Sequence, residues 1–280
     1  MRDDLADVRL RGIVEAARFV EGRPARVKVP VAPLRRAADA TSPRDTEALF
    51  GESLVVFEQA AGWAWVQLEA DGYVGYLEQA TLDDAPAGET THRVAARSAV
   101  VYKTASALSE PVMVLPMNAE VAVLGQDGSF AAIAGGGFVG SGLLSPKHAR
   151  AKDFVAVAES FLGTPYIYGG KSHIGIDCSG LVQMSLRATG AMVPRDSDMQ
   201  AAEVGQPIDV GADLEGLKRG DLVFWPGHVA IMVSEADVVH ATATWMRTVH
   251  EPMAAVAERA RKGGPIVAGV RRLAGVALTG

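Results

Sequence analysis

Cysteine is almost absent from this sequence, because Cys178 is the only one among 280 residues. One cysteine cannot form an internal disulfide bond, which fits a reducing compartment. No apolar run approaches the roughly 18 residues that are needed to span a bilayer. Residues 1–5 also lack the basic and then apolar layout of a secretory signal peptide. These absences predict a cytoplasmic protein with no membrane partner.

An excess of positive charge is lacking too. The chain carries 27 basic and 33 acidic residues, a formal net charge of −6, which argues against a polyanionic partner such as nucleic acid. What is present is a hydrophobic fraction of 49% and a charged fraction of 21%, typical of a globular chain that can bury sizeable cores. The length suggests about two domains, with room for a small third one.

The first half of the chain changes its pattern twice. Residues 7–20 place apolar side chains at helical spacing, so a short amphipathic helix is predicted within an N-terminal extension over residues 1–24. Residues 25–84 instead form short alternating runs cut by turn residues, which is typical of a small β-barrel. Residues 85–147 begin with a breaker-rich linker and repeat the strand pattern more weakly. The two segments are interpreted as two copies of one barrel.

Residues 148–280 change pattern again. Helical spacing over 153–161 ends at Gly163, and the stretch 201–220 looks irregular. Four strands are predicted after the helical part: residues 221–225, 228–233, 238–241 and 266–270. Helices followed by an antiparallel sheet predict an α+β domain, so the fold class expected for the chain is α+β, with two small barrels first.

Cys178 is predicted to stand at the first turn of a helix. The segment 163–170 holds Pro and paired Gly and cannot be helical, whereas apolar residues at helical spacing continue to Gly190. Unpaired N–H groups and the positive end of the helix dipole favour a thiolate there. The alternative is a small buried apolar residue, the role of most free cysteines. The polar neighbours Asp177 and Ser179 favour a reactive role.

Two histidines complete a possible catalytic set. His228 opens one predicted strand and His240 lies on the strand joined to it by a tight turn, so the two can be neighbours on a sheet. In thiol catalysis His228 would take the thiol proton and His240 would fix the orientation of its ring. A zinc site formed with Cys178 is the alternative, but close pairs of ligands are lacking. The remaining histidines are interpreted as structural: His92, His148, His173 and His250.

Five short motifs carry a family resemblance. They are PYIYGG at 165–170, DCSGL at 177–181, PRDS at 194–197, GHVAI at 227–231 and HA at 240–241. In order and spacing they resemble the NlpC family of papain-like bacterial cell-wall peptidases, over about residues 150–275. The two upstream barrels look like the bacterial SH3-like domains that precede this catalytic domain in members that recycle murein peptides. Tyr168 stands where the family often has Trp, and both are flat aromatic residues.

The resemblance implies roles for individual residues. Cys178, His228 and His240 would form the triad, and the Cys178 backbone N–H would help to bind the oxyanion. The residues implied in substrate binding are Tyr166, Asp177, Ser179 and Ser197, with Glu47 and Tyr73 from the first barrel. For these last two the ordinary alternatives are a solvated surface charge for Glu47 and a place in the barrel core for Tyr73.

The resemblance also implies an activity without a cofactor. The expected protein is a cytoplasmic cysteine endopeptidase that cuts the γ-D-glutamyl bond to diaminopimelate or lysine in murein tri- and tetrapeptides. It would release L-Ala-D-Glu from peptides with a free amino end, because the barrels block one side of the groove. A non-catalytic peptidoglycan-binding protein and an acyltransferase on the same fold are the alternatives.

Asp177 has two possible roles beside a thiolate. Two negative charges disfavour each other, so a substrate ammonium could neutralise Asp177 and couple binding to activation of the thiol. The other possibility is that Asp177 caps the helix, as Asp often does. The two roles are compatible.

Overall fold

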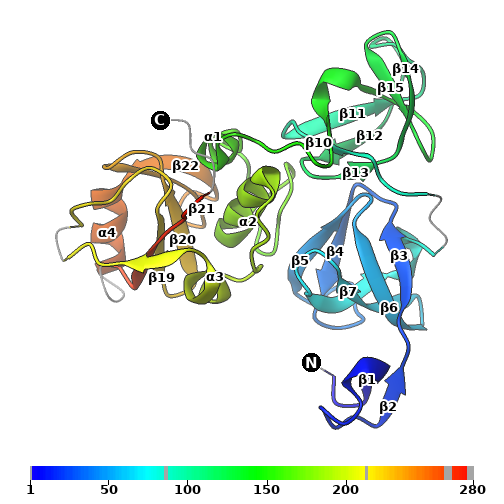
Figure 1. Cartoon of the computed structure of the whole chain (residues 1–280), viewed down its shortest axis with the longest axis horizontal. Helices are drawn as coiled ribbons and strands as arrows, with labels where there is room; N and C mark the ends of the chain where they lie inside the picture. The colour runs from blue at the N-terminus through cyan, green and yellow to red at the C-terminus, as the bar shows by residue number, and fades with distance from the viewer. Residues whose placement is uncertain (1, 85–87, 212–213, 262–266, 276–280) are drawn as a thin grey trace. The chain divides into compact units, whose positions relative to one another are not determined.

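The computed structural model of the chain describes residues 2–84, 88–211, 214–261 and 267–275. It divides into two compact units, Met1–Lys147 and His148–Gly280 (Figure 1). Both contain β-sheets, and the longer helices belong to the second unit, so the chain is of mixed α/β composition. No helix in the described ranges is long and apolar enough to cross a bilayer.

The amphipathic helix predicted over residues 7–20 is not formed, so that prediction was wrong. The segment contains the end of β1 (Leu5–Asp7), a single 3-10 turn (Val8–Leu10) and β2 (Arg18–Val20), and β1 pairs with β2 in parallel. Gly12 adopts a positive φ of 85°, which ends any helical run there. The predicted apolar face also lacks a surface to pack on, because Ile13 is 76% exposed.

One antiparallel sheet forms the next part of the first unit, in the order β5-β4-β8-β7-β6-β3-β9. Its strands are β3 (Arg23–Val27), β4 (Val31–Arg35), β5 (Arg44–Leu49), β6 (Ser53–Ala60), β7 (Trp63–Leu68), β8 (Val74–Glu78) and β9 (Leu82–Asp83). Ala61 and Gly62 join β6 to β7, both at positive φ, as a two-residue type I′ hairpin requires. A turn through Asp71 and Gly72, with Gly72 at a positive φ of 73°, precedes β8.

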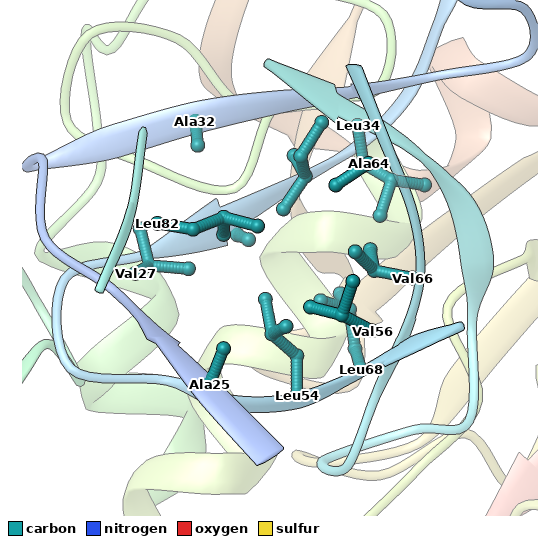
Figure 2. Packing of buried hydrophobic residues seen from close by; sticks show 12 residues of the cluster. Ala25, Val27, Ala32, Leu34, Leu54, Val56, Ala64, Val66, Leu68 and Leu82 are labelled. Atoms are coloured by element: carbon teal, nitrogen blue, oxygen red, sulfur yellow. The ribbon is translucent and has the colours of Figure 1, made fainter. Parts of the chain in front are cut away.

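The strands of this sheet surround a single apolar core. Along β7, buried and partly buried residues alternate, so that Ala64, Val66 and Leu68 point inward. Figure 2 shows them in one cluster with Leu34 from β4 and Leu54 from β6. Within the described residues the strand order is open, running from β5 at one edge to β9 at the other, so the structure shows a curled sheet around this core and does not show the closed barrel that was predicted.

Two smaller sheets share a second core in the first unit. The first has the order β13-β10-β17 and the second β12-β11-β16-β15-β14. Their strands are β10 (His92–Val94), β11 (Ser98–Tyr102), β12 (Pro111–Pro116), β13 (Glu120–Val121), β14 (Val123–Asp127), β15 (Phe130–Ile133), β16 (Phe138–Gly140) and β17 (Leu144–Pro146). Phe50 packs against this second core, and its carbonyl accepts a hydrogen bond from the Glu120 N–H at 2.8 Å. The two strand-rich segments are therefore in direct contact.

The second unit has helices packed on an antiparallel sheet of order β18-β23-β19-β20-β21-β22. Its strands are β18 (Gln206–Ile208), β19 (Leu222–Trp225), β20 (His228–Met232), β21 (Asp237–Thr242), β22 (Arg247–Pro252) and β23 (Gly269–Arg272). Its helices are α1 (Phe154–Glu159), α2 (Cys178–Thr189), α3 (Ser197–Glu203) and α4 (Met253–Arg261). Figure 1 shows the sheet between α4 and α2, and α2 packs against both β20 and β21.

The helix and strand predictions for this unit are largely confirmed. Helix α1 and strands β19, β20 and β21 lie where the pattern placed them. The stretch predicted to be irregular contains the end of α3 and the strand β18, and β22 and α4 were not predicted. The last predicted strand, over 266–270, overlaps β23 at its C-terminal end, and its first residue lies outside the described ranges.

Candidate active site

Cys178 is the first residue of α2, as predicted, and only 6% of its surface is exposed. Asp177 caps the helix, because its Oδ1 accepts a hydrogen bond from the Gly180 N–H at 2.7 Å. A glycine is required at 180, since a Cβ atom there would lie 2.4 Å from the carbonyl oxygen of Gly170. The first turn of α2 can therefore lie directly against the glycine-rich loop, and this contact fixes the position of the thiol.

The resting thiol is not ionised, contrary to the prediction from its place at a helix start. Burial raises the pKa of Cys178 to about 11, and the nearby Asp177 carboxylate acts in the same direction. Backbone N–H groups of Val229 and Ser179 donate to the sulfur and oppose this shift without reversing it. Desolvation therefore raises the pKa of the thiol by more than the helix terminus lowers it. A base must remove the thiol proton for the sulfur to react.

Two neutral imidazoles lie at the start of β20 and in β21. The Nε2 atom of His228 is 2.8 Å from the Nδ1 atom of His240. Burial and the neighbouring His240 lower the pKa of His228 to about 3, so the ring is unprotonated at neutral pH. The N–H of Val229, the next residue along β20, donates to the sulfur of Cys178. The structure thus brings the three residues of the predicted triad into one region.

Two residues that sequence reasoning did not single out lie behind this pair. Glu251, on β22, places its Oε2 atom 2.9 Å from the Nε2 atom of His240. Arg259, on α4, donates two hydrogen bonds to the same carboxylate, at 2.9 and 2.7 Å. The register pairs Val238 with Glu251, which puts Glu251 on the face of the sheet that carries His240. Because neither β22 nor α4 was predicted, no sequence pattern pointed to these partners.

A second arginine lies under the thiol-bearing turn. Arg195 is 2% exposed and donates to both carboxylate oxygens of Asp177, at 3.0 and 2.7 Å. It also donates to the hydroxyl of Ser179 at 2.8 Å. The Asp177 charge is therefore compensated inside the chain and does not depend on a substrate ammonium. The signal in the sequence was the PRDS motif, whose arginine supplies the cation that a buried Asp needs.

The other predicted site residues are distributed over both units. Tyr166 lies near the thiol, since burial, Cys178 and Asp177 together raise its pKa to about 12. Ser197 begins α3 and lines a cavity of about 450 Å³ whose wall also includes Trp225 and Gly227. No group of three or more His, Cys, Asp or Glu side chains in the described part of the chain is placed to hold a metal ion.

Glu47 and Tyr73 belong to the first unit. Glu47, on β5, is 1% exposed and forms an ion pair with Arg44, so the alternative of a solvated surface charge was wrong. Tyr73 is partly buried and packs against the core formed by β3 to β9, which agrees with the alternative that it belongs to the core of the first barrel.

The site combines a buried thiol at a helix start with a neutral histidine that is hydrogen-bonded to a second one and whose chain neighbour, Val229, donates to the sulfur. Such a set can act as nucleophile, base and orienting group. On an α+β scaffold this set defines a cysteine peptidase of the papain-like class. The chain belongs to the NlpC/P60 family, which residues 163–258 match. Residues 34–82 match the bacterial dipeptidyl-peptidase Sh3 domain, so the sheet formed by β3 to β9 is an SH3-like domain.

Individual relatives share either one domain or most of the chain. Dipeptidyl-peptidase 6 of Lysinibacillus sphaericus is 38% identical over 114 residues, which cover 38% of this chain and 41% of that protein. Gamma-D-glutamyl-L-lysine dipeptidyl-peptidase of Bacillus subtilis is 26% identical over 219 residues, or 71% of this chain and 72% of that protein. The crystal structure of an NlpC/P60 family protein from Bacillus cereus has the same fold, with a TM-score of 0.73 and 22% identity over 89% of this chain and 99% of that one.

Proposed function

We propose that this protein is a cysteine endopeptidase that cleaves the γ-D-glutamyl bond to a diamino acid in murein peptides and releases L-Ala-D-Glu. The observation that carries this proposal is the hydrogen-bonded pair of His228 and His240, with the N–H of the adjacent residue Val229 donating to the buried thiol of Cys178. Similarity to a relative named for γ-D-glutamyl-L-lysine dipeptidyl-peptidase activity supports the class of bond, with diaminopimelate or lysine after it.

The chemistry follows from the protonation states of the resting site. Neutral His228 takes the proton of Cys178 as the sulfur attacks the carbonyl carbon, and the backbone N–H of Cys178 donates to the developing oxyanion. The imidazolium then protonates the leaving amine, and water hydrolyses the thioester with the same ring as base. Since the thiol is uncharged at rest, the negative sulfur forms only when the imidazolium forms with it.

Substrate selection in this proposal involves both units. Tyr166 and Ser197 would contact the peptide near the thiol, and the cavity beside Ser197 is large enough for a side chain of the substrate. Asp177 and Ser179 would contribute through the network that Arg195 holds in place. We further propose that Glu47 and Tyr73 contact the substrate from the SH3-like domain, which would restrict the groove to short peptides with a free amino end.

The domain organisation belongs to the same proposal. Residues 25–84 and 85–147 would be two SH3-like domains, and residues 148–280 the peptidase domain. The second of these is supported by its own apolar core, which includes Val94, Val101 and Val139. A cytoplasmic location for recycling of tri- and tetrapeptides, in a compartment that keeps Cys178 reduced, completes the proposal and is checked by cell fractionation.

The central test is hydrolysis of L-Ala-γ-D-Glu-diaminopimelate, followed by mass spectrometry of the products. We expect Cys178→Ala to abolish release of L-Ala-D-Glu while the fold is retained, because the nucleophile is lost. His228→Gln should also be inactive, whereas His250→Gln, at an exposed position on β22, should keep wild-type turnover. Undiminished turnover by Cys178→Ala would contradict the proposal.

Acetylation of the substrate's amino end tests the restricted groove. We expect cleavage of the acetylated tripeptide to fall strongly, whereas equal cleavage of both peptides would contradict a role for Glu47 and Tyr73 in recognising the amine. Tight binding of the peptide by the wild type without cleavage would indicate a binding protein. Transfer of the acyl group to an added amine would indicate an acyltransferase.

A further inference from the structure

We propose that Glu251 is a positioning residue whose carboxylate sets the proton positions of both histidines, so that the lone pair of His228 lies on Nδ1. The inference rests on the proposed function for its kinetic consequence, but the proton positions themselves can be measured without any substrate. Glu251 contacts His240, which in turn contacts His228, so Glu251 acts through these rings and not directly on the reacting atoms.

Four side chains form a continuous line of hydrogen bonds. Arg259 donates twice to the Glu251 carboxylate, which lies 2.9 Å from Nε2 of His240. The other nitrogen of His240, Nδ1, lies 2.8 Å from Nε2 of His228. Each imidazole is thus contacted on one named nitrogen by the preceding group. If the direction of the hydrogen bond is fixed at one end of this line, the nitrogen that carries the proton in each ring is determined as well.

The carboxylate is that fixed end, because an ionised carboxylate only accepts hydrogen bonds. The proton of His240 must therefore be on Nε2, and a neutral ring then has its lone pair on Nδ1. Nε2 of His228 must in turn carry a proton and donate it to that lone pair. A neutral His228 is left with its lone pair on Nδ1, where it can accept the proton of Cys178.

Without the carboxylate the same two rings have a second arrangement. His240 could carry its proton on Nδ1 and donate it to Nε2 of His228 over the same distance. His228 would then carry its own proton on Nδ1, and this nitrogen could not act as the base. Two histidines alone are therefore ambiguous, and the charge of Glu251 removes the ambiguity.

The charges around the pair are consistent with this role. Burial acts to raise the pKa of Glu251, but hydrogen bonds from Arg259, His240 and Trp245 outweigh it and lower that pKa, which keeps the carboxylate ionised. The groups that act on His228 are His240 and Arg259, which disfavour its protonated form, and Asp177 and Glu251, which favour it. Glu251 therefore also stabilises the imidazolium that forms during the reaction.

The matched pair of variants is Glu251→Gln and Glu258→Gln. Both remove one negative charge, but Glu258, on α4, is exposed and its ion pair with Arg261 is long at 3.7 Å. We expect Glu251→Gln to lower kcat at least about tenfold with little change in KM, since it removes the constraint on the proton positions. The loss should stay below the roughly 10⁴-fold effect of a wrong tautomer next to the base of a serine protease triad. Glu258→Gln should leave both constants unchanged.

The decisive measurement is nitrogen-15 NMR of the histidine rings at neutral pH, on Cys178→Ala protein and on the same protein carrying Glu251→Gln. We expect both rings protonated on Nε2 when Glu251 is present, and a second population protonated on Nδ1 when it is replaced. Identical ring signals in the two proteins would overturn the proposal, as would Glu251→Gln enzyme with wild-type kcat. If the wild type cleaves no murein peptide, the proposed function fails, yet the NMR comparison still decides the role of Glu251.

Discussion

Two of the carboxylate–arginine pairs in the peptidase unit involve the surroundings of Cys178 and His240, and they differ in burial and in what they hold. The side chains of Asp177 and Arg195 are 7% and 1% exposed, and their pair ties the start of α2 to the loop beneath it. The side chains of Glu251 and Arg259 are 12% and 35% exposed, and their pair holds a histidine ring. The first pair therefore supports the fold around Cys178, and in the proposed function the second supports the state of the base.

The comparison shows why the loss of a carboxylate–arginine pair can affect stability in one place and catalysis in another. A buried charge that loses its partner is costly, because nothing else solvates it. A pair that reaches solvent contributes little to stability, because water and ions take over its interactions. The effect of the second pair is expected in the chemistry, where a single proton position decides whether the base works.

The largest expected effect separates the two arginines directly. Arg195→Met should lower the free energy of unfolding by about 3–5 kcal/mol, since it leaves the Asp177 carboxylate buried without its cation. Arg259→Met should lower it by at most about 1 kcal/mol. Urea unfolding at neutral pH measures both. Equal losses for the two variants would show that burial does not distinguish the pairs.

A smaller effect is expected from the close packing around the first pair. Gly180→Ala should lower the free energy of unfolding by about 1–3 kcal/mol, because the new Cβ would overlap the carbonyl oxygen of Gly170. Gly269→Ala, on β23, is the control, since a Cβ there has no atom within 4 Å. A Gly180→Ala protein as stable as this control would mean that the loop can move away from α2.

The pH dependence of stability probes the histidine side of the comparison. Burial lowers the pKa of folded His228 to about 3, whereas an unfolded histidine titrates near about 6.5. Between these values the unfolded chain binds more protons, so the stability present above pH 6.5 is lost as the pH falls toward 3. His228→Gln should reduce this slope, and His250→Gln should not. An unchanged slope in His228→Gln would contradict the burial of a neutral ring.

The parts of the site that depend on local chemistry could be predicted from the sequence. A glycine-rich loop, an Asp cap and Gly190, which ends α2 at a φ of 87°, were enough to place Cys178 at a helix start. Short apolar runs predicted β20 and β21, which carry the two histidines. These features are set by residues close together in the chain, where steric and capping rules apply.

The parts that could not be predicted depend on contacts between distant residues. The ionisation of Cys178 was misjudged because the helix terminus is visible in a sequence, whereas the extent of burial is not. Asp177 meets Arg195 and His240 meets Glu251 only after the chain has folded back. The helix predicted near the N-terminus failed for the related reason that an apolar stripe needs a surface to cover it.

The covered, protonated sulfur of Cys178 has a consequence for reagents and inhibitors. Alkylating agents and peroxide react with accessible thiolates, whereas this sulfur is largely covered and uncharged at rest. The protein should therefore withstand oxidants that inactivate exposed cysteine enzymes. A covalent inhibitor would need to resemble the peptide closely enough to draw the proton onto His228 before its own reactive group can be attacked.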